Sequence, residues 1–459
     1  MSLTRHIAFI CLIGMLTPLA RADISAEIAE ASAPLPEGVP EVAVVRLQAL
    51  LNRNLPDAEW RAVAEKLAEA QVAAREPEDT LVLLADARVR QLPWAKFWRA
   101  QAFASLKRWA DALPLYEELA THEGSPFRGA ATFGAAEMLR ALGKREEALR
   151  KLNLLLHDKE WAIRAQLRAA ELSIEMADAA NAQRLLEEMK PRSVAERRER
   201  RLLRGRLELI LQRPERAIGM FQTLLKRPEG AAHATLIAAL FGIAEAHLQL
   251  KTPEAGDDVI EQFVDLHPAD SDLPLLFAKL DELYRAEHKP SRNELEKWVR
   301  RPEEPRRTFA RWYLARLEIR GGRSDRARQL FSDLRRTGIK SPAIAPAFLE
   351  FAQFEVEDGH FDEAIAILDD ARLLHPEPAL LARIDFLSAQ AHYLAKRFRR
   401  RLLNKSPIPI RPGRELRSLM PPTAGCNLVI TLVSWLITAS WTSRAVTMRL
   451  APTYDWRKA

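Results

Sequence analysis

The sequence predicts an all-α protein built as a row of antiparallel helix pairs, and three observations carry this prediction. Alanine, leucine, arginine and glutamate dominate the chain, and all four are good helix formers. Small residues recur at a fixed period over most of its length, which is typical of repeat architectures. Prolines follow at matching positions, where they stop helices.

The clearest copy of the repeat runs from residue 348 to 376. Ala352 precedes a second small residue, Ala364, by twelve positions, and Gly359 lies between them as a turn. Pro376 closes the unit. Two antiparallel helices approach closely only where both present small side chains at the crossing, and larger apolar residues fill the space around it. This segment therefore predicts one helix–turn–helix pair.

The same pattern recurs along the chain. The small residue of the second helix returns in steps of 34 to 39 residues, at Ala112, Ala148, Ala182, Ala217, Gly256, Ser291, Ala327 and Ala364. Its partner on the first helix lies twelve positions earlier, at Ala100, Ala136, Ala170, Gly205, Ala244, Ala315 and Ala352. The copy over 271–305 is degenerate, because Lys279 occupies the earlier position.

These positions resemble the tetratricopeptide repeats (TPR) of exported bacterial proteins, over roughly residues 93–398. The resemblance implies a right-handed superhelical solenoid in which the first helix of each repeat lines a concave groove. The implied apolar lining is Phe97, Phe133, Leu202, Phe241, Trp312 and Leu349. The implied polar lining is Gln101, Glu137, Glu171, Arg206, Glu245, Arg316, Arg320 and Gln353. Packing of the aromatic members against neighbouring repeats is an equally open interpretation.

The remaining segments differ from the repeats. Residues 1–22 have the order of a secretory signal peptide: Arg5, an apolar run over 7–16, and small residues at Ala20 and Ala22. An anchoring N-terminal helix is the alternative. Residues 23–40 predict a flexible lead-in, and 41–92 a helical cap or a degenerate repeat. We expect a periplasmic or secreted protein.

The tail over 399–459 breaks the pattern at Arg401, where a ninth repeat needs a small residue. The tail from residue 397 has twelve basic and two acidic residues (+10), whereas residues 1–396 have 57 basic and 60 acidic residues (−3). Three interpretations of this tail are open: a membrane anchor over 425–442, a short β-hairpin, and a shifted reading frame that leaves a disordered peptide. The shifted reading frame is favoured. The truncated repeat would leave a helix with an exposed apolar face.

No catalytic, phosphate-binding or zinc-spaced motif stands out, so the sequence predicts no enzyme, no cofactor and no metal. The body's charge of −3 speaks against nucleic acid as a partner, and membrane contact is expected only through the tail. The predicted function is a non-catalytic exported scaffold that binds protein or peptide segments. The alternative is a helical-toroid enzyme of polysaccharide or cell-wall metabolism, which clustered carboxylates would favour. The arginine run over 197–206 is either a solvated helix face or a site for an acidic segment.

Overall fold

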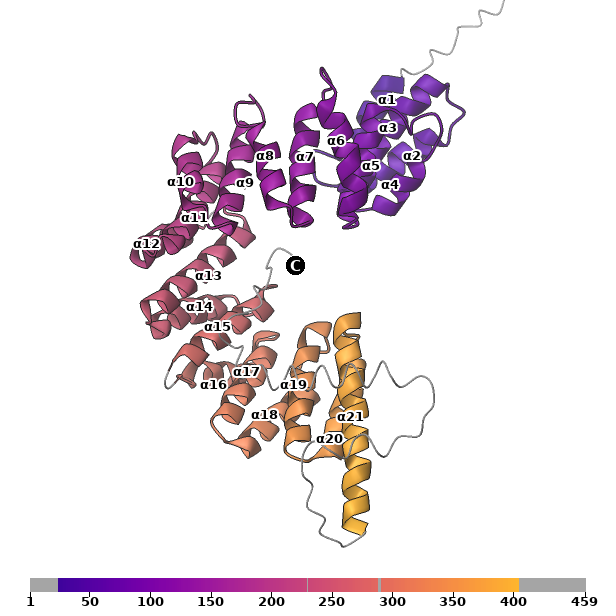
Figure 1. Ribbon diagram of the computed structural model, residues 1–459. Helices are drawn as coiled ribbons and strands as arrows, with labels where there is room; N and C mark the ends of the chain where they lie inside the picture. The colour runs from indigo at the N-terminus through magenta and orange to yellow at the C-terminus, as the bar shows by residue number, and fades with distance from the viewer. Residues whose placement is uncertain (1–23, 229, 288–289, 404–459) are drawn as a thin grey trace, which may run out of the picture. The chain divides into compact units, whose positions relative to one another are not determined.

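The computed structural model describes residues 24–228, 230–287 and 290–403, and every regular element within them is a helix (Figure 1). The predicted signal peptide and the tail from residue 404 onward lie outside the described residues. No helix among the described residues is long and apolar enough to cross a membrane. The chain divides into two units, residues 1–347 and 348–459.

The first unit contains eighteen α-helices among its described residues. They are α1 (Ile24–Ser32), α2 (Pro40–Leu51), α3 (Asp57–Ala73), α4 (Pro77–Leu83), α5 (Pro93–Ser105), α6 (Trp109–Thr121), α7 (Arg128–Ala141), α8 (Arg145–Asn153), α9 (Ala162–Glu175), α10 (Ala179–Glu188), α11 (Val194–Ile210), α12 (Pro214–Leu225), α13 (His233–Leu250), α14 (Pro253–Leu266), α15 (Leu273–Ala286), α16 (Asn293–Arg300), α17 (Arg306–Arg320) and α18 (Ser324–Thr337).

From α5 to α14 each helix packs against the next one along the chain (Figure 1). Consecutive first helices, such as α9 and α11 or α11 and α13, also contact one another. This alternation of pair contacts and stacking contacts confirms the predicted all-α array of antiparallel helix pairs.

The recurring small residues lie where the helices of a pair cross. All the alanines of the two series are at most 2% exposed, for example Ala136 at 1% and Ala148 at 0%. The bulky residue four positions after the second small residue fills the neighbouring space, and Tyr116, Leu152 and Phe221 are each at most 1% exposed. The small residues that recur in the sequence therefore mark the positions where the two helices of each pair pack closely.

The turn inside each pair repeats as well. A residue with positive φ ends the first helix at Lys107, Gly143, Ala177, Gln212, Lys251, Gly322 and Gly359. The next residue's amide donates back to the carbonyl five positions earlier, as from Lys144 to Leu139 at 2.9 Å and from Arg213 to Glu208 at 2.8 Å. This is the Schellman end of a helix, in which a left-handed residue lets the chain reverse.

One further pair lies before the predicted array. Ala68 on α3 and Thr80 on α4 are twelve positions apart and 0% exposed, and Arg75 between them has a φ of 62°. The helices α3 and α4 thus have the same turn and crossing as the repeats. Residues 24–32, where the sequence predicts a flexible lead-in, form α1, because Ile24 and Ile28 fall one turn apart and pack on the cluster around Leu47.

The degenerate copy over 271–305 is built on different side chains. Ser291 lies before α16, which begins only at Asn293, so no small residue marks a crossing there. Trp298 on α16 is fully buried, with its ring centroid 5.6 Å from that of Phe277 on α15, and its Nε1 donates to Asp265 at 3.0 Å. In this copy the large indole of Trp298 therefore fills the contact between helices that alanines make in the other copies.

The arginine run at the start of α11 has a structural role. Arg200 donates to the carbonyl of Met189 at 2.9 Å, and Arg204 donates to the carbonyl of Leu186 at 3.3 Å. These carbonyls end α10, whose last turn has no intrahelical partners for them. These hydrogen bonds therefore join α11, the first helix of one repeat, to α10, the second helix of the repeat before it.

The second unit contains α19 (Ala345–Glu357, which begins three residues before it), α20 (Phe361–Arg372) and α21 (Pro378–Leu403), and a short 3₁₀ turn at Pro342–Ile344 precedes it. Arg372 on α20 donates to Asp385 on α21 at 2.9 Å. Phe386 and Tyr393, seven positions apart on α21, are 45% and 53% exposed. The predicted break at Arg401 falls within α21, and the residues that follow this helix lie outside the described part of the chain.

Candidate binding surface

A row of ion pairs crosses three consecutive first helices. Glu137 on α7 accepts from Arg140 at 3.0 Å and lies 2.7 Å from the Nε of Arg168 on α9. Arg168 also pairs with Glu171, and Glu171 lies 3.2 Å from an Nη of Arg206 on α11. We call these five residues the charged ladder. Their pairing shows that the three helices present them on one common face.

The charged ladder is partly buried, and its charges are fixed by one another. Glu171 is 9% exposed, and only 21% of the Arg206 side chain is exposed. Burial works against the charge of Arg168, but the carboxylates of Glu137 and Glu171 outweigh burial and raise the pKa of Arg168. Opposite charges alternate along the row, so it offers a partner a rigid polar surface with little net charge.

A second group of charges lies on α15 and α17. Asp281 is 1% exposed and pairs with three arginines: Arg285 on its own helix, Arg316 at 3.2 Å and Arg320 at 2.5 Å. The arginine side chains are 56%, 25% and 36% exposed. We call these four residues the arginine cluster. The buried Asp281 is thus a shared partner of arginines from two helices.

Aromatic side chains of α15 and α17 pack beside the arginine cluster and fix its position. Phe277 on α15 packs on Tyr313 of α17, with ring centroids 5.4 Å apart, and Trp312 lies 4.9 Å from Tyr313. The guanidinium of Arg316 lies over the Tyr313 ring, 5.2 Å from its centroid. These contacts fix the spacing of α15 and α17, and with it the spacing of the guanidinium groups.

The predicted apolar lining residues divide by burial. Phe97, Trp312 and Leu349 are 8%, 8% and 5% exposed and pack in the core, where Phe97 stacks on Phe127 at 4.9 Å. Phe133, Leu202 and Phe241 are half-buried. The centroid of Phe133 lies 5.5 Å from that of Trp161, and the Lys279 ammonium lies 6.0 Å from the Phe241 ring.

The predicted polar residues divide by location. Glu137, Glu171 and Arg206 meet in the charged ladder, and Arg316 and Arg320 meet on Asp281. Gln101 and Glu245 are half-buried on α5 and α13 and belong to neither group. Gln353, in the second unit, is exposed and donates to Glu357 at 3.1 Å.

Four members of these groups were not predicted: Arg140, Arg168, Asp281 and Arg285. Arg140 lies four positions after the small residue Ala136, a spacing that the resemblance places on the same face. Asp281 has no such signal, because it belongs to the degenerate copy, in which no small residue sets the register.

A group of carboxyl side chains lies between α14 and α15. Asp257 is 5% exposed, and burial together with its hydrogen bond to Glu287 raises its pKa to about 8. Burial raises the pKa of Glu261 to about 7, although the Tyr284 hydroxyl donates to it at 2.5 Å. Raised carboxyl pKa values accompany catalytic sites and also buried structural clusters.

Comparisons with known proteins add a weak likeness of fold. No family model matches the chain, and no curated protein matches its sequence. It is similar to a solved tetratricopeptide repeat protein from Parabacteroides merdae, with 18% identity, coverage of 56% of this chain and 96% of that one, and a TM-score of 0.37.

Two complexes are also similar to it. The Cut9–Hcn1 hetero-tetramer of APC/C matches with 15% identity, 84% and 73% coverage and a TM-score of 0.42. Naa15/Naa10 bound to HypK-THB matches with 14% identity, 92% and 73% coverage and a TM-score of 0.30. The recurring helix pairs themselves define the described chain as a TPR-like helical-repeat array.

Proposed function

We propose that the chain is a non-catalytic scaffold that binds protein or peptide segments on the face of its first helices, and that the arginine cluster receives an acidic stretch of the partner. The observation that carries the proposal is the arrangement of Arg285, Arg316 and Arg320 around the buried Asp281. The charges are held in place before a partner arrives, so little side-chain entropy is lost on binding.

The chemistry of the cluster favours carboxylates. A guanidinium has five N–H donors in a planar fork that matches a carboxylate, and the Arg285 and Arg320 side chains are 56% and 36% exposed, so a partner can reach them. The charged ladder then supplies alternating charges that would set the register of a longer segment. Both groups lie on first helices, α7, α9 and α11 for the ladder and α15 and α17 for the cluster.

A peptide titration tests this proposal. A fluorescent acidic peptide of about twelve residues, rich in Asp and Glu, is titrated with the full chain and compared with a basic peptide of equal length. Arg285→Gln with Arg320→Gln removes two charges and leaves Arg316 to balance Asp281. Because each charge-assisted hydrogen bond contributes about 1.5–3 kcal/mol, binding should weaken at least about tenfold.

The matched control removes two arginines from second helices. Arg300→Gln on α16 with Arg336→Gln on α18 changes the net charge equally, at side chains that are 77% and 76% exposed. Binding should stay within about twofold of the wild type, since surface charges of this kind contribute little. Equal weakening by both double variants would mean that only net charge matters, and the proposed site would be abandoned.

We further propose that the scaffold works in the periplasm or cell envelope. The charged, apolar and small-residue order of residues 1–22 supports export. N-terminal sequencing of the protein from fractionated cells should give a mature chain that begins at Asp23. A chain recovered from the cytoplasm with Met1 in place would contradict this.

The cluster of carboxyl side chains between α14 and α15 supports a second candidate, an exported enzyme of polysaccharide or cell-wall metabolism. A protonated and an ionised carboxyl group can act there as acid and base. The burial of Asp257 speaks for a structural role instead. Release of soluble fragments from purified cell wall by the chain, abolished in Asp257→Asn and Glu261→Gln, would favour the enzyme over the scaffold.

A further inference from the structure

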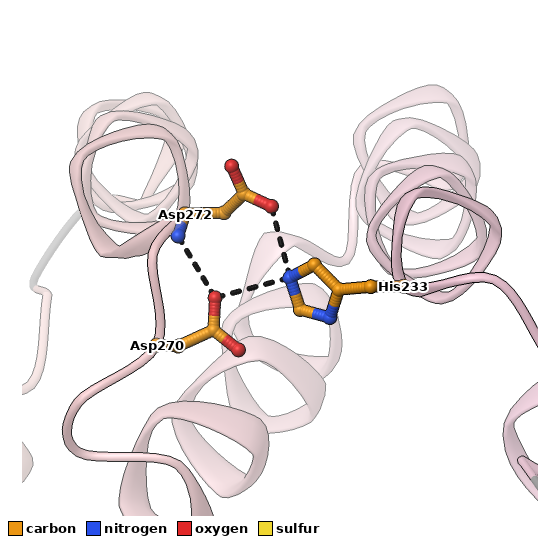
Figure 2. A group of neighbouring side chains, drawn as sticks. All are labelled: His233, Asp270 and Asp272. Atoms are coloured by element: carbon orange, nitrogen blue, oxygen red, sulfur yellow. Dashed lines mark hydrogen bonds and ion pairs between the residues drawn. The ribbon is translucent and has the colours of Figure 1, made fainter. Parts of the chain in front are cut away.

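We propose that His233, Asp270 and Asp272 form a binding site for one divalent transition-metal ion of the zinc type. His233 is the first residue of α13, Asp270 lies in the loop after α14, and Asp272 directly precedes α15. Figure 2 shows the imidazole and both carboxylates turned toward one point. The proposal is independent of the binding surface on the first helices.

The distances between the side-chain atoms fit a single bound metal ion. The Nε2 atom of His233 lies 3.2 Å from Oδ1 of Asp270 and 3.0 Å from Oδ2 of Asp272. Zinc–ligand bonds of about 2.0–2.2 Å at angles between about 90° and 110° place ligand atoms roughly 2.8–3.6 Å apart. The three candidate ligand atoms all lie within 4.8 Å of one another.

One nitrogen cannot satisfy both carboxylates by itself. An imidazole Nε2 carries at most one hydrogen, so it has no separate hydrogen bond for each of Asp270 and Asp272. A cation at the meeting point would accept all three donor atoms together and offset the repulsion between the two carboxylates. One imidazole nitrogen and two carboxylate oxygens around a single point are the arrangement that a bound metal ion would use.

The surroundings hold the ligands in position. The side chain of Asp270 is only 8% exposed, and its Oδ1 accepts from the backbone N–H of Asp272 at 2.8 Å. Such a second contact orients a carboxylate toward a metal. The His233 side chain is 46% exposed, so one side of the site is open to water or to a ligand atom from a partner.

The ligand set narrows the choice of metal. One imidazole nitrogen and two carboxylate oxygens suit Zn²⁺ or Mn²⁺, whereas Ca²⁺ and Mg²⁺ prefer oxygen ligands in greater number. Zn²⁺ binds more tightly than Mn²⁺ to a given set of this kind. A bound ion would join the start of α13 to the start of α15, and so tie one helix pair to the next beside the irregular copy over 271–305.

The test is calorimetric titration of the full chain with Zn²⁺ alone, after treatment with a chelator and with a purification tag that contains no histidine. The wild type should bind one equivalent more than His233→Gln, or bind that equivalent at least about tenfold more tightly. Lowering the pH from 7.5 to 5.5 should weaken the same equivalent, because the metal needs a deprotonated imidazole. His122→Gln, at an exposed loop histidine, should bind as the wild type does.

A second measurement separates binding from folding. Zn²⁺ should raise the melting temperature of the wild type and of His122→Gln but not of His233→Gln, and all three should melt alike in the presence of chelator. Equal Zn²⁺ binding by His233→Gln and the wild type would overturn the proposal, and so would the absence of any Zn²⁺ binding by the wild type. In either case the three side chains form an ion pair only.

Discussion

The ring of Phe221 on α12 lies so close to Gly242 on α13 that a Cβ atom at this glycine would be 2.4 Å from the ring. Gly205 on α11 meets the same ring from the other side, where a Cβ would lie at 2.5 Å. Phe221 is fully buried. One phenyl ring therefore fills the space among three consecutive helices, and it fits only because two of them carry no side chain there.

Gly242→Ala should destabilise the chain. The added methyl group has no space beside Phe221, so the helices must move apart or the ring must leave its rotamer. Overpacking of this kind costs about 1–3 kcal/mol. Chemical denaturation followed by circular dichroism measures the loss, and Gly242→Ala with Phe221→Leu should recover part of it.

Gly219→Ala is the matched control. Gly219 lies on α12 itself, and a Cβ there meets nothing within 4 Å. The substitution should stabilise the chain by up to about 1 kcal/mol, as expected for glycine to alanine in an exposed helix interior. A similar loss of stability in both variants would show that the space around Phe221 does not decide the effect.

The turns inside the pairs predict stabilising substitutions. Lys107 and Gln212 have φ values of 59° and 56°, a conformation that costs a residue with a Cβ about 1–2 kcal/mol. Lys107→Gly and Gln212→Gly should each raise the stability by about 0.5–1 kcal/mol, after the greater entropy of glycine in the unfolded chain is subtracted. Gly143→Ala, at a φ of 79°, should lower it. Thermal melts that shift in the opposite directions would contradict this account of the turns.

The cluster of carboxyl side chains between α14 and α15 predicts a dependence of stability on pH. The pKa of Asp257 is about 8 and that of Glu261 about 7 in the folded chain, whereas the ordinary pKa values of these side chains are 3.8 and 4.5. The folded state therefore keeps protons that the unfolded state has released, and stability falls as the pH rises from about 4 to about 8.

Asp257→Asn should flatten this dependence. A difference of one pKa unit corresponds to about 1.4 kcal/mol, so the wild type should lose at least about 1 kcal/mol more than the variant between pH 5 and pH 8. The control is Asp325→Asn, at a fully exposed carboxylate on α18, which should behave as the wild type does. Parallel pH profiles for all three proteins would show that Asp257 ionises freely.

The charged ladder predicts a measurable coupling between Glu171 and Arg206. A double-mutant cycle of Glu171→Gln and Arg206→Met should give about 1 kcal/mol or more, because the pair is largely buried. The exposed pair Arg184–Glu188, one turn apart on α10, should give only about 0.3–0.5 kcal/mol. Equal coupling in the two pairs would mean that burial does not strengthen the ladder.

Much of the fold follows from local signals in the sequence. Ala136 and Ala148 mark a crossing because close helix packing admits only small residues, and Gly143 marks the turn between them. The pair α3–α4 was predicted only as a cap or degenerate repeat, because Thr80 and Arg75 stand where alanine and glycine usually do.

The candidate sites follow less well from the sequence. Arg168 meets Glu137 across 31 residues, and His233 meets Asp272 across 39, so each contact depends on how one helix pair stacks on the next. The spacing of small residues gives the register within a pair but not the rotation between pairs. The convergence of Arg316 and Arg320 on Asp281 was missed for this reason, and Asp281 itself was missed because no small residue sets the register of its degenerate copy.

Photo-crosslinking in intact cells tests the central claim most directly. A photoreactive amino acid replaces Gln101 on α5, Glu245 on α13 or Arg320 on α17, and in three controls it replaces exposed residues of second helices: Glu146 on α8, Arg300 on α16 and Arg336 on α18. Mass spectrometry then identifies what each position captures. Binding on the first helices predicts one shared partner at the first three positions and its absence from the controls. The same partner captured equally well from the second helices, or from those alone, would contradict it.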